Sequence, residues 1–159
     1  MKSHTKAIRN LLRSREANSI IETAFVMPVL VLLLLGAFDF GRAYYYAVEV
    51  SSAAHAAATY GIHNLSDSAG MTSAAQLDAP DVSTLATTAN YGCECFDGSA
   101  KSTSCTTPPT SCAEGSTAEN YVNYVQVKTT ATYKPILVYP GLPTTFTLTG
   151  SAYMRAGGD

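Results

Sequence analysis

An apolar run near the N-terminus constrains this chain more than any other feature. Residues 20–38 are almost all apolar, and as a helix they would span roughly 28 Å, close to the hydrocarbon thickness of a bilayer. Glu22 is the one charged residue of the run and lies at its head, where an ionised carboxylate is costly unless it reaches the interface or finds a partner. The sequence therefore predicts a single membrane-spanning helix with an acid at its start.

The charges on either side of the run predict its orientation. Residues 1–17 carry five basic groups and one acid, whereas residues 18–159 carry five basic groups and eleven acids. The positive-inside rule then predicts a cytoplasmic N-terminus, with everything after Arg42 outside. A mildly acidic exported part argues against nucleic acid as a partner. The predicted organisation is a cytoplasmic basic leader (1–17), a transmembrane helix with an extracytoplasmic extension (18–61), and a small extracytoplasmic domain (62–159).

A distinctive order of residues leads into the apolar run. It consists of a basic leader, the small residue Ala17, four residues and then Glu22. This order resembles the class III signal of type IV pilin-like proteins. The string Ile-Glu-Thr-Ala-Phe-Val-Met-Pro at 21–28 and the string Phe-Asp-Phe-Gly-Arg at 38–42 are similar to TadE-like pseudopilins of the tight-adherence (Flp pilus) system. The resemblance implies a minor pseudopilin in the bacterial inner membrane. Its expected partners are other pilin-like subunits, the pilus assembly machinery and a prepilin peptidase.

The resemblance also implies roles for individual residues. A prepilin peptidase would cut between Ala17 and Asn18, which removes the leader cations and creates a new amino group. Glu22 would then pair with the Asn18 amine of its own chain or of a neighbour, which offsets the cost of a charge at the membrane edge. The alternative is that Glu22 simply reaches the lipid headgroups.

The helix is expected to continue beyond the membrane. Asp39 and Arg42 are three residues apart and share a helix face, so they can form an ion pair at the outer interface. No Pro or Gly interrupts residues 43–60, and Gly61 is the predicted C-terminal cap. Alanine and valine recur at helical spacing in this extension and give it a smooth face for close packing.

The remainder predicts a small sheet domain. One or two short helices are expected, around 71–77 and 80–88, and a strand over 90–96. Apolar and polar residues alternate over 125–133 and 146–154, which indicates two half-buried strands that pair antiparallel and cover the alanine-rich helix. The predicted fold is therefore α+β, a long N-terminal helix packed on an antiparallel sheet. The connector 134–144 is more apolar than a solvated loop, so it either closes the end of the domain or contacts a partner subunit or the membrane surface.

All four cysteines, Cys93, Cys95, Cys105 and Cys112, lie in the part predicted to be outside. Their spacing lacks the paired Cys-x-x-Cys knuckles of structural zinc sites, and no histidine is near. Two disulfides are therefore favoured over a metal site. Nested pairing, Cys95 with Cys105 and Cys93 with Cys112, follows the way a loop folds back on itself, and the crossed pairing stays open.

Catalysis has no support in the sequence. Three scattered histidines, without a phosphate loop or a nucleophile elbow, form no catalytic constellation, and we expect no cofactor. Two alternatives to the pseudopilin remain. One is an uncleaved single-pass anchor that displays a binding domain. The other is a secreted domain cut after Ala43 by a conventional signal peptidase, which would accept the small residues Gly41 and Ala43.

Overall fold

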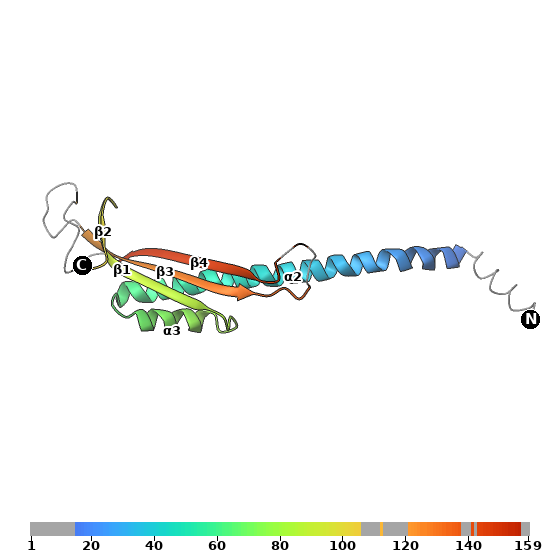
Figure 1. Cartoon of the computed structure of the whole chain (residues 1–159), viewed down its shortest axis with the longest axis horizontal. Coiled ribbons are helices and arrows are strands. Elements are labelled where there is room, and N and C mark those ends of the chain that lie inside the picture. Colours follow the sequence, from blue (N-terminus) through green and yellow to red (C-terminus); the bar gives the residue numbers. More distant parts are fainter. Residues whose placement is uncertain (1–14, 106–111, 113–120, 138–140, 142, 157–159) are drawn as a thin grey trace, which may run out of the picture. The chain divides into compact units, whose positions relative to one another are not determined.

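The computed structural model describes residues 15–105, 112, 121–137, 141 and 143–156, with the side chains of 15–18 and 156 left undescribed. Its elements are α2 (Arg15–His63), α3 (Ser68–Asp78), β1 (Ala86–Cys95), β2 (Lys101–Ser102), β3 (Tyr121–Tyr133) and β4 (Phe146–Ala156) (Figure 1). The chain divides into two compact units, Met1–Gly41 and Arg42–Asp159. We call the second the sheet unit. The predicted α+β class, a long helix with an antiparallel sheet, is confirmed.

Helix α2 ends later than the sequence predicted. Gly61 was expected to cap the helix, and this prediction is wrong, because α2 continues to His63. Gly61 is instead buried inside the helix, where a Cβ would lie 2.8 Å from Val125 Cγ1 and 2.9 Å from Met71 Cε. The missing side chain therefore serves close packing of α2 against β3 and α3 rather than termination of the helix.

A larger residue at position 61 should destabilise the sheet unit. Gly61→Val forces its methyl groups against Val125 and Met71, and overpacking of this kind costs about 2 kcal/mol. The measurement is urea unfolding of the full chain in mild detergent, followed by near-ultraviolet circular dichroism. The control is Gly41→Ala, whose Cβ meets nothing within 4 Å and should leave the midpoint unchanged or slightly raised. Equal midpoints for Gly61→Val and wild type would contradict the packing role.

The sheet has the order β2-β1-β3-β4, and each neighbouring pair is antiparallel. The predicted pairing of the last two strands is confirmed, with Val127 of β3 opposite Ala152 of β4. The first strand begins earlier than predicted, at Ala86.

The two predicted short helices have different outcomes. The one over 71–77 lies within α3, where the side chain of Asp67 caps the helix by accepting a 2.8 Å hydrogen bond from the Gly70 amide. The one over 80–88 is wrong. Turns occupy the segment after Ala79, and β1 takes up its last three residues. Pro80 disfavours helical geometry at the residue before it, and the β-branched Thr87 and Thr88 suit a strand.

The core of the sheet unit lies between the alanine face of α2 and the sheet, as predicted. Its fully buried residues include Val50, Ala53, Ala54, Ala57, Ala58, Val125 and Val127. Small helical side chains let the backbones approach so closely that the buried Thr129 Oγ1 donates a 2.6 Å hydrogen bond to the Val50 carbonyl. Gly150, opposite Thr129 on β4, leaves room for this contact, because a Cβ there would lie 2.7 Å from Thr129 Oγ1.

Candidate functional site

The first half of α2 presents an uninterrupted apolar surface. By length and composition the helix over Ser19–His63 is able to cross a membrane. Every side chain from residue 19 to residue 35 is exposed, including Phe25 (77%) and Leu34 (69%). Soluble monomers rarely expose so large a contiguous apolar area, whereas a lipid-facing helix must be apolar all round. This surface is the first part of the candidate site.

Glu22 lies within this exposed surface. Its neighbour Thr23 donates a hydrogen bond of 2.9 Å to the carbonyl of Ser19 within the helix. The predicted cleavage point, Ala17–Asn18, falls in the first turn of α2, but those two side chains are outside the described part, as are residues 1–14. Cleavage and the pairing of Glu22 with the Asn18 amine therefore stay predictions.

Asp39 and Arg42 stand where the two compact units meet along the chain. Asp39 is only 5% exposed, although its neighbours Phe38 and Phe40 are 62% and 77% exposed. Arg42 places its guanidinium carbon 5.9 Å from the centre of the Tyr133 ring, which is a cation–π contact. The ion pair between Asp39 and Arg42 stays a prediction.

An aromatic cluster follows directly after Arg42. The rings of Tyr46 and Tyr133 meet edge to face with centroids 5.7 Å apart. Tyr45 donates a 2.6 Å hydrogen bond to Glu49 Oε1, and this bond to a carboxylate raises the pKa of Tyr45. The end of β3 is thus held beside the first turns of α2 in the sheet unit.

At the other end of the sheet unit, a buried carboxylate is surrounded by donors. Glu94 of β1 is fully buried. Lys101 Nζ lies 2.9 Å from its Oε2, Arg155 Nε donates to its Oε1 at 2.5 Å, and the Tyr153 hydroxyl also donates to it. Lys101 Nζ in addition lies 4.2 Å from the centre of the Tyr153 ring, which stacks on Tyr124. We call these five residues the Glu94 cluster.

The environment of Glu94 shifts its pKa. Burial alone would raise the pKa, but the hydrogen bonds from Tyr153, Lys101 and Arg155 outweigh it and hold the pKa below its usual value. Hydrogen bonds to Tyr153 and Glu94 raise the pKa of Lys101 in turn. Glu94 is therefore ionised at neutral pH, and the cluster is a structural ion-pair network that joins β1, β2 and β4.

The Glu94 cluster was not predicted from the sequence. One signal was available, because Glu94 lies between Cys93 and Cys95 in a strand and must point to the opposite face. Its cations are 7 and 61 residues away in sequence, and only the strand register brings them together.

Both predicted disulfides are present, but they pair differently from the nested prediction. The bonds join Cys93 to Cys105 and Cys95 to Cys112, with Cα–Cα distances of 5.2 and 5.4 Å. The nested pairing is wrong and the crossed alternative holds. With all four thiols oxidised, none remains as a metal ligand.

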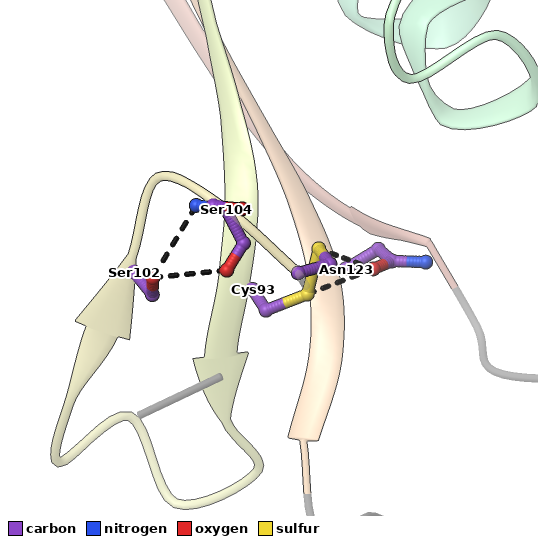
Figure 2. Close-up of a disulfide and its surroundings, with 5 residues drawn as sticks. Cys93, Ser102, Ser104 and Asn123 are labelled. Carbon is purple, nitrogen blue, oxygen red and sulfur yellow. Dashed lines mark hydrogen bonds between the residues drawn. A yellow bond between two sulfur atoms is a disulfide. The ribbon is translucent and has the colours of Figure 1, made fainter. Parts of the chain in front are cut away.

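The hairpin between β1 and β2 explains the crossed pairing. Cys93 lies opposite Ser102, so the chain just beyond β2 passes the Cys93 side chain. The Ser102 hydroxyl donates to the Ser104 carbonyl and accepts from the Ser104 amide, which turns the chain ahead of Cys105 (Figure 2). On β3, Asn123 lies opposite Cys93, and its side-chain amide contacts both sulfur atoms of the bond at 3.1 Å.

The fold is that of an α+β protein with one helix of membrane-crossing length and composition, whose continuation packs on an antiparallel sheet. Residues 18–59 match the family model described as TadE-like protein. The match covers the apolar run and the alanine-rich part of α2, and it confirms the resemblance predicted from those residues. No curated protein and no solved structure matches the chain.

Proposed function

We propose that this chain is a minor pseudopilin that takes part in Flp pilus assembly or secretion. The TadE-like match over residues 18–59 carries the proposal, because it includes residues 19–35, whose side chains are all exposed. In this proposal α2 anchors the chain in the bacterial inner membrane. The N-terminus is cytoplasmic, by the charge asymmetry across the helix, and the sheet unit is extracytoplasmic. The role is structural rather than catalytic.

Assembly would proceed through helix packing in the bilayer. Ala37 and Gly41 are exposed and four residues apart, so they lie on one face of α2. A Cβ at Gly41 would meet nothing within 4 Å. Small residues at this spacing let a second membrane helix approach closely, and van der Waals packing then drives association. Gly36, next to Ala37, widens the same small-residue surface.

Processing would prepare the helix for assembly. A cut between Ala17 and Asn18 removes five cations from the cytoplasmic side and leaves an amino group four residues before Glu22. In lipid the carboxylate of Glu22 is costly when unpaired, so a partner subunit that offers its own amino terminus gains affinity from pairing. Glu22 would thereby select helices that have been processed.

One of the two alternatives fits these observations less well. A signal peptidase cut after Ala43 would break α2 in mid-helix. It would also remove Arg42, which packs on the Tyr133 ring of the sheet unit. An uncleaved anchor keeps the whole helix, and it differs from the pseudopilin in retaining Met1 as its N-terminus.

Replacing Glu22 by Ala should leave membrane insertion intact and impair assembly. Loss of a charge pair worth about 1.4 kcal/mol would lower association with partner subunits about tenfold. The measurement compares the membrane-bound amount of the chain with the number of pili per cell.

The matched control for Glu22→Ala is Thr23→Ala, which removes only a hydrogen bond to the helix's own Ser19 carbonyl. Cells with this control variant should form the wild-type number of pili. A wild-type number of pili in the Glu22→Ala strain would contradict the proposed pairing of Glu22 with an amino terminus.

A further inference from the structure

The connector between β3 and β4 begins and ends at a pair of aromatic residues. Tyr133, the last residue of β3, lies opposite Phe146, the first residue of β4. Phe146 is 37% exposed, and Ile136, three residues after Tyr133, is 56% exposed. Two exposed apolar side chains therefore flank the point where the chain leaves β3 and enters β4. We call Tyr133 and Phe146 the connector stem.

Contacts within the sheet unit fix the connector stem beside the first turns of its helical part. The Tyr133 ring lies 5.9 Å from the Arg42 guanidinium carbon and 5.7 Å from the Tyr46 ring. The stem therefore has the same position along the helix axis as residues 42–46.

That position lies close along the chain to the end of the apolar run. Arg42 follows Phe38, the last residue of the run, by four residues, which span at most about 14 Å even when fully extended. The polar layer on each side of the hydrocarbon core is about 5 to 8 Å thick. If residues 20–38 cross the bilayer, as the proposed function requires, the connector stem lies in or next to this layer.

The residues around the stem have the chemistry of a membrane interface. Tyr44 and Tyr45 are 69% and 53% exposed, and Lys134, which follows Tyr133, is exposed as well. Tyrosine is enriched at headgroup level, and lysine can extend its ammonium group to phosphates while its apolar stem stays in the interface. Ile136, two residues further along, is the apolar group that such an arrangement would insert.

We propose that the sheet unit docks on the phospholipid interface through residues 134–136, with Ile136 inserted among the lipids and Lys134 at the phosphates. This inference rests on the membrane anchoring in the proposed function and adds a second attachment to it. The second attachment restricts how far the sheet unit can tilt from the membrane surface, and so which of its faces neighbouring subunits meet.

The chain has no tryptophan, so one introduced tryptophan reports its own surroundings. The full chain carrying Ile136→Trp is reconstituted in phosphatidylcholine vesicles that contain a lipid with a nitroxide either near the headgroup or deep in the acyl chain. The expected result is a blue-shifted emission that the shallow nitroxide quenches more than the deep one. The matched control is Leu77→Trp on α3, at a position 82% exposed, which should emit as in water and escape both nitroxides.

A third variant separates this inference from the anchoring beneath it. Phe25→Trp, at a position 77% exposed within the apolar run, should be quenched by the deep nitroxide. If Phe25→Trp is quenched and Ile136→Trp emits as in water, the proposed lipid docking is wrong, whereas membrane anchoring by the apolar run is supported. If Ile136→Trp is blue-shifted but escapes both nitroxides, a protein surface covers the site and the docking is overturned. If no variant is quenched, both the membrane anchoring and the lipid docking are contradicted.

Discussion

Replacing all four cysteines by alanine is expected to lower the free energy of unfolding of the sheet unit by about 6 kcal/mol. The two bonds close loops with sequence separations of 12 and 17, and in the chain-entropy model each contributes about 3 kcal/mol. A domain of this size has a total stability of about 5 to 15 kcal/mol, so the variant should be close to unfolding in water. Urea unfolding of the full chain in detergent measures the loss. A decrease of less than about 1 kcal/mol would contradict a stabilising role for the bonds.

Pairwise replacement tests the crossed connectivity without any stability measurement. In Cys93→Ala/Cys105→Ala the crossed pairing leaves the bond between Cys95 and Cys112 intact, so alkylation without reduction should label no thiol. In the matched variant Cys95→Ala/Cys105→Ala, each remaining cysteine has lost its partner, so two labels are expected. The reverse pattern would restore the nested pairing and overturn the arrangement at the β1–β2 hairpin.

Replacing Lys101 and Arg155 together by methionine is expected to destabilise the sheet unit by about 3 kcal/mol. Glu94 is 1% exposed, and a buried charge that loses its partners costs about 3 to 5 kcal/mol. The lower end applies because the two cationic side chains are themselves 49% and 45% exposed and therefore partly screened by solvent. The control is Lys128→Met, which removes an exposed lysine of β3 and should change the stability by less than about 0.5 kcal/mol.

The pH dependence of the same variant distinguishes an unpaired charge from lost packing. In the wild type the pKa of Glu94 is lowered on folding. Its contribution is therefore present above the unfolded-state pKa, about 4.3, and is lost as the pH falls through the folded value. Without Lys101 and Arg155, burial raises the pKa of Glu94 instead. Stability should then fall as the pH rises above about 4.3. Parallel pH profiles for variant and wild type would contradict the account of the Glu94 cluster.

The sequence predicted those parts of the fold that follow from periodicity. Helical spacing identifies the apolar face of α2 that carries Val50, Ala53 and Ala57, and alternation identifies the apolar face of β3. Because both faces must be buried, the helix and the sheet are expected to pack together. The apolar run was recognisable because bilayer thickness sets its length.

The features that the sequence could not predict depend on the register of the paired strands. Gly61 looks the same in sequence whether it caps a helix or admits Val125 and Met71, because only the sheet's position determines which role it has. Glu94 meets Arg155 across two strand pairings, and Cys105 meets Cys93 because a tight hairpin places Ser102 opposite Cys93. In each case the contact depends on how segments distant in sequence pair with one another. The register of that pairing cannot be deduced from a single sequence.

The proposed function depends most on α2 anchoring the chain as a processed pilin-like helix. The decisive measurement is the intact mass of the chain from the membrane fraction, with and without the host's prepilin peptidase. We expect a membrane-bound chain that begins at Asn18 when the peptidase is present and at Met1 when it is absent. A soluble chain that begins at Tyr44 in both strains would contradict it.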